Sequence, residues 1–171
     1  MAPPSLEVAD IVRRKKAQYG HIVDSKKWDL LSNVILPSAR MSFYEPDGKP
    51  TQVGKYINVF ESRDEYVKQI GRFLEGGQTM HVFGYGDLEQ TGPDEVKAVF
   101  SMNDTFFLNG SGGLIWSSGG GHYYERWVRQ GDDWFVAELR LQRLNVNKST
   151  LFWMVDRMIA FASLLGIDVS P

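Results

Sequence analysis

The chain contains no cysteine among its 171 residues, and this absence removes disulfide frameworks and thiol chemistry from consideration. Histidine is nearly as scarce, with three copies, so histidine chemistry would have to use His21, His81 or His122. Positive charge is not in excess, because the formal net charge is −2, and no nucleic-acid partner is expected. The one basic cluster, residues 13–16, falls inside a helical pattern and is interpreted as a solvated helix face.

Long hydrophobic runs are also missing. The longest, residues 158–165, is far shorter than the roughly 20 residues that span a bilayer, so no membrane partner is expected. Residues 1–5 lack the apolar core of a signal peptide, which predicts a cytoplasmic protein. The length predicts a single domain over residues 1–171, because domains commonly have roughly 100–200 residues.

Helical spacing of apolar residues occupies the first part of the chain. One helix follows a cap at Ser5, and a second, short helix over residues 28–35 is expected to end at Pro37. A third begins at a capping box that starts with Ser62. An amphipathic helix over residues 148–165 closes the chain and is expected to cover a pocket or an interface.

The apolar pattern changes to a period of two after the third helix, which predicts strands joined as hairpins. Glycines at residues 119–121 interrupt one strand and predict a bulge that bends the sheet. Helices followed by such strands indicate an α+β fold with a curved, mixed or antiparallel sheet. The helices and the bent sheet are expected to enclose a mostly apolar pocket. The predicted strands are residues 39–44, 78–90, 95–108, 114–130 and 134–143.

Alternation along these strands separates the side chains of the two sheet faces. Asp104 falls on an otherwise apolar face, where burial would raise the pKa of its carboxyl group unless a partner compensates; a solvated aspartate is the alternative. One face of the last hairpin is expected to line the pocket through Phe135, Ala137, Leu139 and Leu141. The strand faces opposite the pocket lining carry large apolar side chains that a monomer would expose to water, namely Trp127, Trp134 and Val136. These side chains predict a homodimer or homotrimer.

Two strand histidines and one aspartate are the candidate catalytic residues. Asp24 lies at the junction of the first two helices, and we expect it to converge with His81 and His122 on one cavity. General acid–base catalysis needs a group that titrates near neutrality and a carboxylate that orients it. The same three residues could instead hold a non-haem metal ion, although no local metal-ligand spacing is present and no metal site is predicted.

Several segments resemble the SnoaL-like branch of the nuclear-transport-factor-like cone fold, and among its members the fungal scytalone dehydratases. They are residues 24–31 (DSKKWDLL), residues 36–43 (LPSARMSF), and residues 79–81, which match the strand that carries that family's catalytic histidine. The resemblance implies the cone fold. It also implies that His81 is the catalytic histidine and that Asp24 orients it.

Other positions depart from the dehydratase pattern. Val23 and Phe43 stand where the dehydratase has tyrosines that hold a catalytic water, and Phe106 replaces a second histidine. His122 and Tyr124 replace a serine and an asparagine that bind substrate. Dehydration of scytalone itself is therefore not expected.

Together these features predict a cofactor-independent enzyme of secondary metabolism, expected in fungi. It would dehydrate, isomerise or cyclise a small hydrophobic intermediate of polyketide or terpenoid type. His81 would take or relay a proton, and His122 would be the complementary acid or hold a substrate oxygen. A binding or accessory domain without chemistry is the alternative. The expected substrate contacts are Tyr19, Val23, Phe43, Asp104, Phe106, Tyr124 and Leu139.

Overall fold

The computed structural model describes residues 2–53 and 56–165. Ser5 and Ser62 cap the first and second α-helices, and each side chain accepts a hydrogen bond from the backbone N–H three residues further on, as the sequence predicts. The helical elements are α1 (Leu6–Ser25), the 3₁₀ helix η1 (Trp28–Asn33), α2 (Arg63–Glu75) and α3 (Thr150–Leu164).

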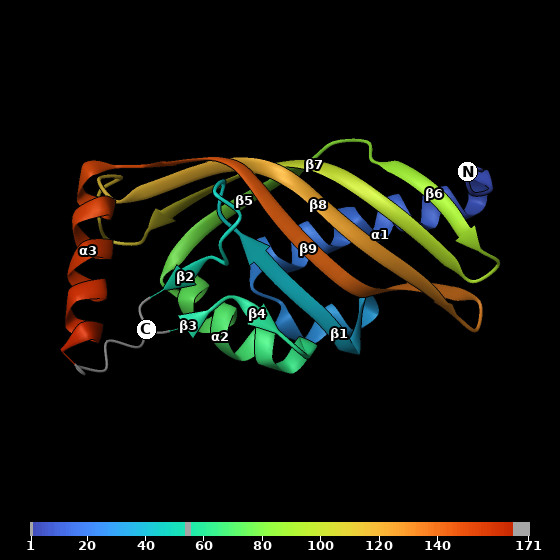
Figure 1. Cartoon of the computed structure of the whole chain (residues 1–171), viewed down its shortest axis with the longest axis horizontal. Helices are drawn as coiled ribbons and strands as arrows, with labels where there is room; N and C mark the ends of the chain where they lie inside the picture. The colour runs from blue at the N-terminus through green and yellow to red at the C-terminus, as the bar shows by residue number, and fades with distance from the viewer. Residues whose placement is uncertain (1, 54–55, 166–171) are drawn as a thin grey trace.

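A long curved sheet forms the other layer of the molecule (Figure 1). Its strands are β1 (Ile35–Tyr44), β4 (Val59–Phe60), β5 (Gly77–Phe83), β6 (Asp87–Gly92), β7 (Glu95–Leu108), β8 (Trp116–Gln130) and β9 (Asp133–Lys148). A separate pair is formed by β2 (Gln52–Val53) and β3 (Tyr56–Ile57). The strand order of the sheet is β4-β1-β9-β8-β7-β5, and β6 pairs with β7. Strand β1 runs parallel to β9, and the other pairs are antiparallel.

Four predicted element boundaries are wrong. The second helix is shorter than predicted, and the strand after it already begins at Ile35. Pro37 does not end a helix; it lies where the pairing of β1 with β9 is irregular, a position that tolerates a residue without an N–H group. The predicted strand 78–90 is two strands, because the chain leaves the ladder at residues 84–86. The last strand continues to Lys148.

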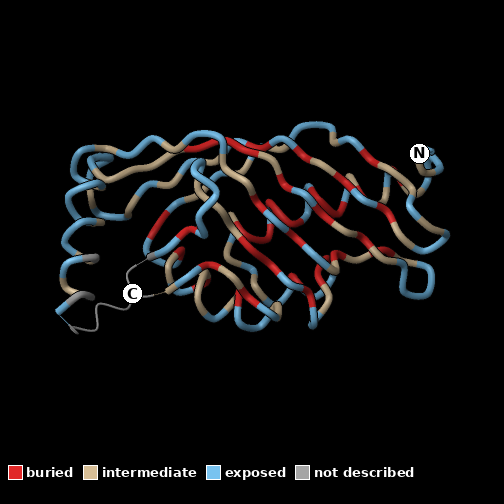
Figure 2. Tube along the Cα trace, in the orientation of Figure 1, coloured by how far each residue is buried: buried red, intermediate tan, exposed pale blue. Residues whose placement is uncertain are grey.

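Helices α1 and α2 pack on one side of the sheet, where α1 contacts β5 and β9 and α2 contacts β1 and β5. Buried positions are concentrated along α1 and the middle of the sheet, whereas α3 stands across one end of the sheet and is largely exposed (Figures 1 and 2). The predicted glycine bulge is present, since the pairing of β8 with β9 shifts between Gly120 and Gly121.

A second bulge, at Ala137, shifts the alternation of inner and outer side chains along β9, because the pairing with β8 skips this residue. The predicted face that joined Phe135 and Ala137 to Leu139 is therefore wrong. The buried side chains of this strand are Trp134, Val136, Leu139 and Leu141.

Burial within one chain also removes the argument for a partner subunit. Trp127, Trp134 and Val136 are at most 3% exposed within a single chain, so no second copy is needed to cover them. The homodimer or homotrimer stays a prediction. In the part of the chain that the structure describes, no helix has the length and apolar character of a membrane span.

Candidate functional site

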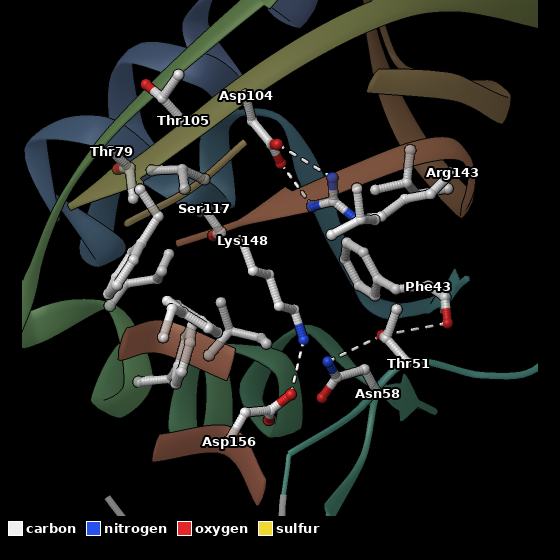
Figure 3. A pocket seen from close by; sticks show the side chains of 18 of the residues that line it. Phe43, Thr51, Asn58, Thr79, Asp104, Thr105, Ser117, Arg143, Lys148 and Asp156 are labelled. Atoms are coloured by element: carbon white, nitrogen blue, oxygen red, sulfur yellow. Dashed lines mark hydrogen bonds and ion pairs between the residues drawn. The ribbon is translucent and has the colours of Figure 1, made fainter. Parts of the chain in front are cut away.

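The sheet and the helices α1, α2 and α3 border a cavity of about 610 Å³. Small-molecule sites typically enclose roughly 300–1,000 Å³ and are lined mainly by apolar groups with a few placed polar ones. Apolar atoms make up most of the surface of the wall, and Figure 3 shows polar groups among them. Helix α3 closes one side, where Lys148 of β9 forms an ion pair with Asp156 of α3 at 2.7 Å.

Asp24 and His81 form a hydrogen-bonded pair at the cavity wall. Oδ1 of Asp24 lies 2.6 Å from Nδ1 of His81, and Oδ2 accepts the backbone N–H of the same histidine at 2.9 Å. A carboxylate on Nδ1 favours the tautomer that carries its proton there, which leaves the lone pair on Nε2. His81 lines the cavity, so its imidazole can act as a base toward a bound molecule.

The last turn of α1 carries Asp24 toward β5. One turn earlier, a Cβ on Gly20 would lie 2.8 Å from the ring of Phe83, so glycine permits the close approach of the helix to this strand. Burial by itself raises the pKa of Asp24, but the hydrogen bonds from the ring and the backbone of His81 outweigh it, and the pKa lies below its ordinary value. Asp24 is therefore a carboxylate at neutral pH.

Three buried tyrosines meet beside this pair. The hydroxyls of Tyr19 and Tyr66 are 3.1 Å apart, and the ring of Tyr19 packs edge-on against Tyr123. Burial raises the pKa of Tyr66 to about 12 and the pKa values of Tyr19 and Tyr123 well above the ordinary range. All three hydroxyls thus keep their protons at neutral pH. One proton is engaged in the hydrogen bond between Tyr19 and Tyr66, which leaves the other hydroxyl hydrogens of the cluster to be donated to a ligand oxygen.

Asp104 and Arg143 form a second polar pair on the cavity wall (Figure 3). The two terminal nitrogens of Arg143 donate to the two carboxylate oxygens at 3.0 and 2.6 Å. Burial works against the charge of Arg143, but the bonds to Asp104 prevail and raise its pKa. The alternative of a solvated Asp104 is wrong, because its side chain is only 15% exposed and paired.

Most of the predicted pocket residues do line the cavity. Asp24 stands behind His81 and reaches the cavity through it. Leu139 is buried at 1% exposure in the core and is not among the lining residues, whereas Leu141 of the same strand is. The predicted residues that line the cavity are Tyr19, Val23, Phe43, His81, Asp104 and Phe106.

The predicted positions of His122 and Tyr124 are wrong. The register of β7 with β8 pairs Tyr123 with Phe100 and His122 with Ser101, so Tyr123 faces the cavity and both neighbours face outward. Tyr124 is 42% exposed. Asp24, His81 and His122 therefore do not converge, and within residues 2–53 and 56–165 no three histidine, cysteine or acidic side chains are placed to hold a metal ion.

Three residues of the site were not predicted: Tyr66, Tyr123 and Arg143. Tyr66 falls on the apolar face of its helix, and Tyr123 would have followed from the correct phase of β8. Arg143 sits at the end of the predicted strand and reaches Asp104 from a distant part of the sequence, for which no local signal exists.

The chain is similar to known proteins of one family. Residues 4–140 match the family model of the SnoaL-like domain. The curated protein named "Probable cyclase FGR4" of Gibberella zeae is 37% identical over 140 residues, which are 82% of this chain and 93% of that protein.

Two solved structures share the fold at low sequence identity. A protein from Novosphingobium aromaticivorans, named "Putative Scytalone Dehydratase", has a TM-score of 0.67 at 14% identity, over 81% of this chain and 85% of that one. A nuclear transport factor 2 (NTF2-like) superfamily protein from Salmonella enterica has a TM-score of 0.65 at 12% identity, over 83% and 94%. With the resemblance predicted from residues 24–43 thus confirmed, this chain belongs to the SnoaL-like domain family, on an NTF2-like fold.

Proposed function

We propose that this protein is a cofactor-independent acid–base enzyme that cyclises, isomerises or dehydrates a small hydrophobic intermediate of polyketide or terpenoid type. The observation that carries the proposal is the Asp24–His81 pair at the wall of a largely apolar cavity. The similarity of the chain to the protein named "Probable cyclase FGR4" favours cyclisation among the three reactions.

The pair suits removal of a proton from carbon. Nε2 of His81 would take a proton from a carbon beside a carbonyl group, and the electron pair of the broken C–H bond would form an enolate. Asp24 would hold the imidazole in the reactive tautomer and stabilise its protonated form. The enolate could then attack a second carbonyl of the same molecule through carbon, or take a proton at a different carbon. It could also expel a hydroxyl group from the neighbouring carbon, which would leave as water with the proton held by His81.

The tyrosine cluster beside this pair would support the chemistry. Tyr19, Tyr66 and Tyr123 keep their protons at neutral pH, and a hydroxyl hydrogen of the cluster outside the Tyr19–Tyr66 bond would be donated to an oxygen that gains charge. This takes over the role that the sequence suggests for His122. The aromatic walls would fold a flexible substrate into a reactive shape.

Exchange of carbon-bound protons tests the proposal without knowledge of the natural substrate. The probe is the first member of a ketone series (2-tetralone, 1-tetralone, flavanone) that binds the protein by isothermal calorimetry, incubated in D₂O and followed by mass spectrometry. Wild type should accelerate exchange beside the carbonyl. His81→Ala should lower this acceleration by the roughly 10²–10⁴-fold that a positioned base contributes.

His122→Ala is the matched control, because it removes the other strand histidine, on the outer face of the sheet, and should leave exchange unchanged. Binding of a ketone without any accelerated exchange in wild type would favour the alternative, a small-molecule-binding domain. Equal exchange by wild type and His81→Ala would contradict the assigned base.

A further inference from the structure

Arg143 reaches its partner across an intervening strand. It lies on β9, Asp104 lies on β7, and β8 runs between them. In the paired strands, Arg143 stands opposite Gly121, and Asp104 stands opposite Gly119. The side chain therefore crosses the cavity face of β8 along a stretch of three consecutive glycines to form its two hydrogen bonds with Asp104.

Gly119 makes room for the guanidinium group. A Cβ at this position would clash with Nη1 of Arg143 and would also lie 2.9 Å from the backbone oxygen of Asn145. A larger residue at 119 therefore requires the guanidinium group or strand β9 to shift. Gly119 thus does more than bend the sheet, because it leaves the space that the cation occupies on the cavity face.

The charge of this cation is already balanced. Asp104 neutralises Arg143 and takes one N–H from each terminal nitrogen, but a guanidinium group has five N–H donors. The remaining donors carry partial positive charge in a site with little net charge. Such a site suits a neutral carbonyl oxygen that gains charge during a reaction better than a carboxylate that is charged from the start.

The second pair also lies beside the catalytic one. His81 and Asp104 are directly paired residues of β5 and β7, and both line the cavity. Side chains of directly paired residues on one face have Cβ atoms about 4.5–5.5 Å apart. Asp104 lies between His81 and Arg143 in the strand order, so a molecule whose C–H bond meets His81 would have to extend past Asp104 to place its carbonyl oxygen on the N–H groups of Arg143.

We propose that Arg143, held over Gly119 by Asp104, is the oxyanion anchor of this site, and that the substrate is an enolisable ketone without a carboxylate at that end. This inference rests on the proposed function, whose base it places next to the anchor. In the reaction, the C–H bond breaks and its proton passes to Nε2 of His81. The electron pair of that bond forms the carbon–carbon double bond of the enolate, and the π pair of the carbonyl group moves to the oxygen, which the N–H groups of Arg143 bind.

Binding of stable analogues tests the anchor independently of any reaction. At neutral pH, 2-naphthol is an uncharged mimic of the enol of 2-tetralone, 2-naphthoate carries a carboxylate, and naphthalene has no oxygen. In calorimetric titrations, wild type should bind 2-naphthol more tightly than 2-naphthoate. Arg143→Gln should weaken 2-naphthol by about tenfold or more, the usual effect of losing a hydrogen bond to a charged group, and leave naphthalene unchanged.

The opposite variant gives a gain of affinity that a misfolded protein could not produce. Asp104→Asn leaves the charge of Arg143 without its counter-ion, so the affinity for 2-naphthoate should rise by about tenfold. The anchor is overturned if 2-naphthoate binds wild type more tightly than 2-naphthol, or if Asp104→Asn does not change this preference.

Gly119→Ala should reproduce the loss of 2-naphthol binding while both charged residues remain. Gly92→Ala is its matched control, since that glycine lies in the β6–β7 hairpin and a Cβ there would meet nothing closer than 3.9 Å. If 2-naphthol binding depends on Arg143 but neither wild type nor any variant accelerates proton exchange, the proposed function fails, and Arg143 remains the residue that binds the ligand oxygen. If His81 controls exchange and Arg143→Gln changes neither exchange nor binding, the anchor fails alone.

Discussion

His81 of β5 and Asp104 of β7 are directly opposite one another in the sheet, on the face that lines the cavity. Each belongs to a hydrogen-bonded pair: Asp24 lies behind His81, and Arg143 donates two hydrogen bonds to Asp104. The proposed base therefore lies beside a carboxylate, and that carboxylate holds the hydrogen-bond donors of Arg143 on the same cavity wall.

Asp24 and His81 should act as one unit in catalysis. Asp24→Asn should lower the rate of proton exchange on the bound ketone by roughly 10²–10⁴-fold, because the imidazole of His81 would no longer be held in the reactive tautomer. His81→Ala should have a similar effect, because it removes the base. The double variant should be little slower than either single one. Ketone affinity should stay nearly constant, since neither change alters the apolar walls. Additive losses in the double variant would show that the two residues act separately.

The Asp24–His81 pair should also make stability depend on pH. The pKa of Asp24 is lower in the folded protein than in the unfolded chain, so the carboxylate stabilises the fold above about pH 4 and this contribution is lost as the pH falls through the native pKa. The Asp24→Asn variant has no carboxylate at this position, so its stability lacks this dependence on pH. The difference in free energy of unfolding between wild type and Asp24→Asn, from urea titrations, should therefore shrink between about pH 5 and pH 2. A constant difference would contradict the assignment.

The ion pair of Lys16 and Glu125 lies in the core, so the interpretation of the basic cluster as a solvated helix face is wrong for Lys15 and Lys16, which are 4% and 1% exposed. Nζ of Lys16 is 2.5 Å from the carboxylate, both side chains are at most 2% exposed, and Trp127 also donates to Glu125. Glu125→Gln leaves the buried ammonium without an anionic partner and should cost about 3–5 kcal/mol of unfolding free energy. The double variant Lys16→Met/Glu125→Leu should recover much of this loss.

Glu61→Gln is the control for that pair. Glu61 binds Nε of Arg40 at 3.1 Å, but the side chains of Glu61 and Arg40 are 69% and 46% exposed, so water competes for both charges and the change should cost less than about 1 kcal/mol. Equal losses from Glu125→Gln and Glu61→Gln in urea unfolding would show that burial of the Lys16 pair does not matter.

The tyrosine cluster should be visible in an alkaline titration. Tyr19, Tyr66 and Tyr123 are three of seven tyrosines, and burial raises their pKa values, that of Tyr66 to about 12. Phenolate absorbance of the native protein at pH 11 should therefore stay well below that of the unfolded chain. Tyr66→Phe should reduce the increase in phenolate absorbance that unfolding causes at pH 11. Tyr85→Phe should not reduce it, because Tyr85 is exposed in the folded protein. Full ionisation at pH 11 without unfolding would contradict the buried cluster.

The amino-acid sequence by itself determined the elements and one half of the site. Caps at Ser5 and Ser62, the change of period after α2, and the glycines at 119–121 are local signals, and local signals predict local structure. The Asp24–His81 pair was predicted as well, because the family resemblance supplied its residues and strand alternation put His81 on an inner face.

The tertiary structure decided which residues complete the site. Alternation fixes the face of a side chain only relative to its neighbours, so one extra residue reverses it. Three glycines carry no pattern that sets the phase of β8, and its register with β7 put Tyr123 inside and His122 outside. The bulge at Ala137 did the same on β9. Arg143 meets Asp104 only because the folded sheet places β9 two strands away from β7, a proximity that no spacing in the sequence records.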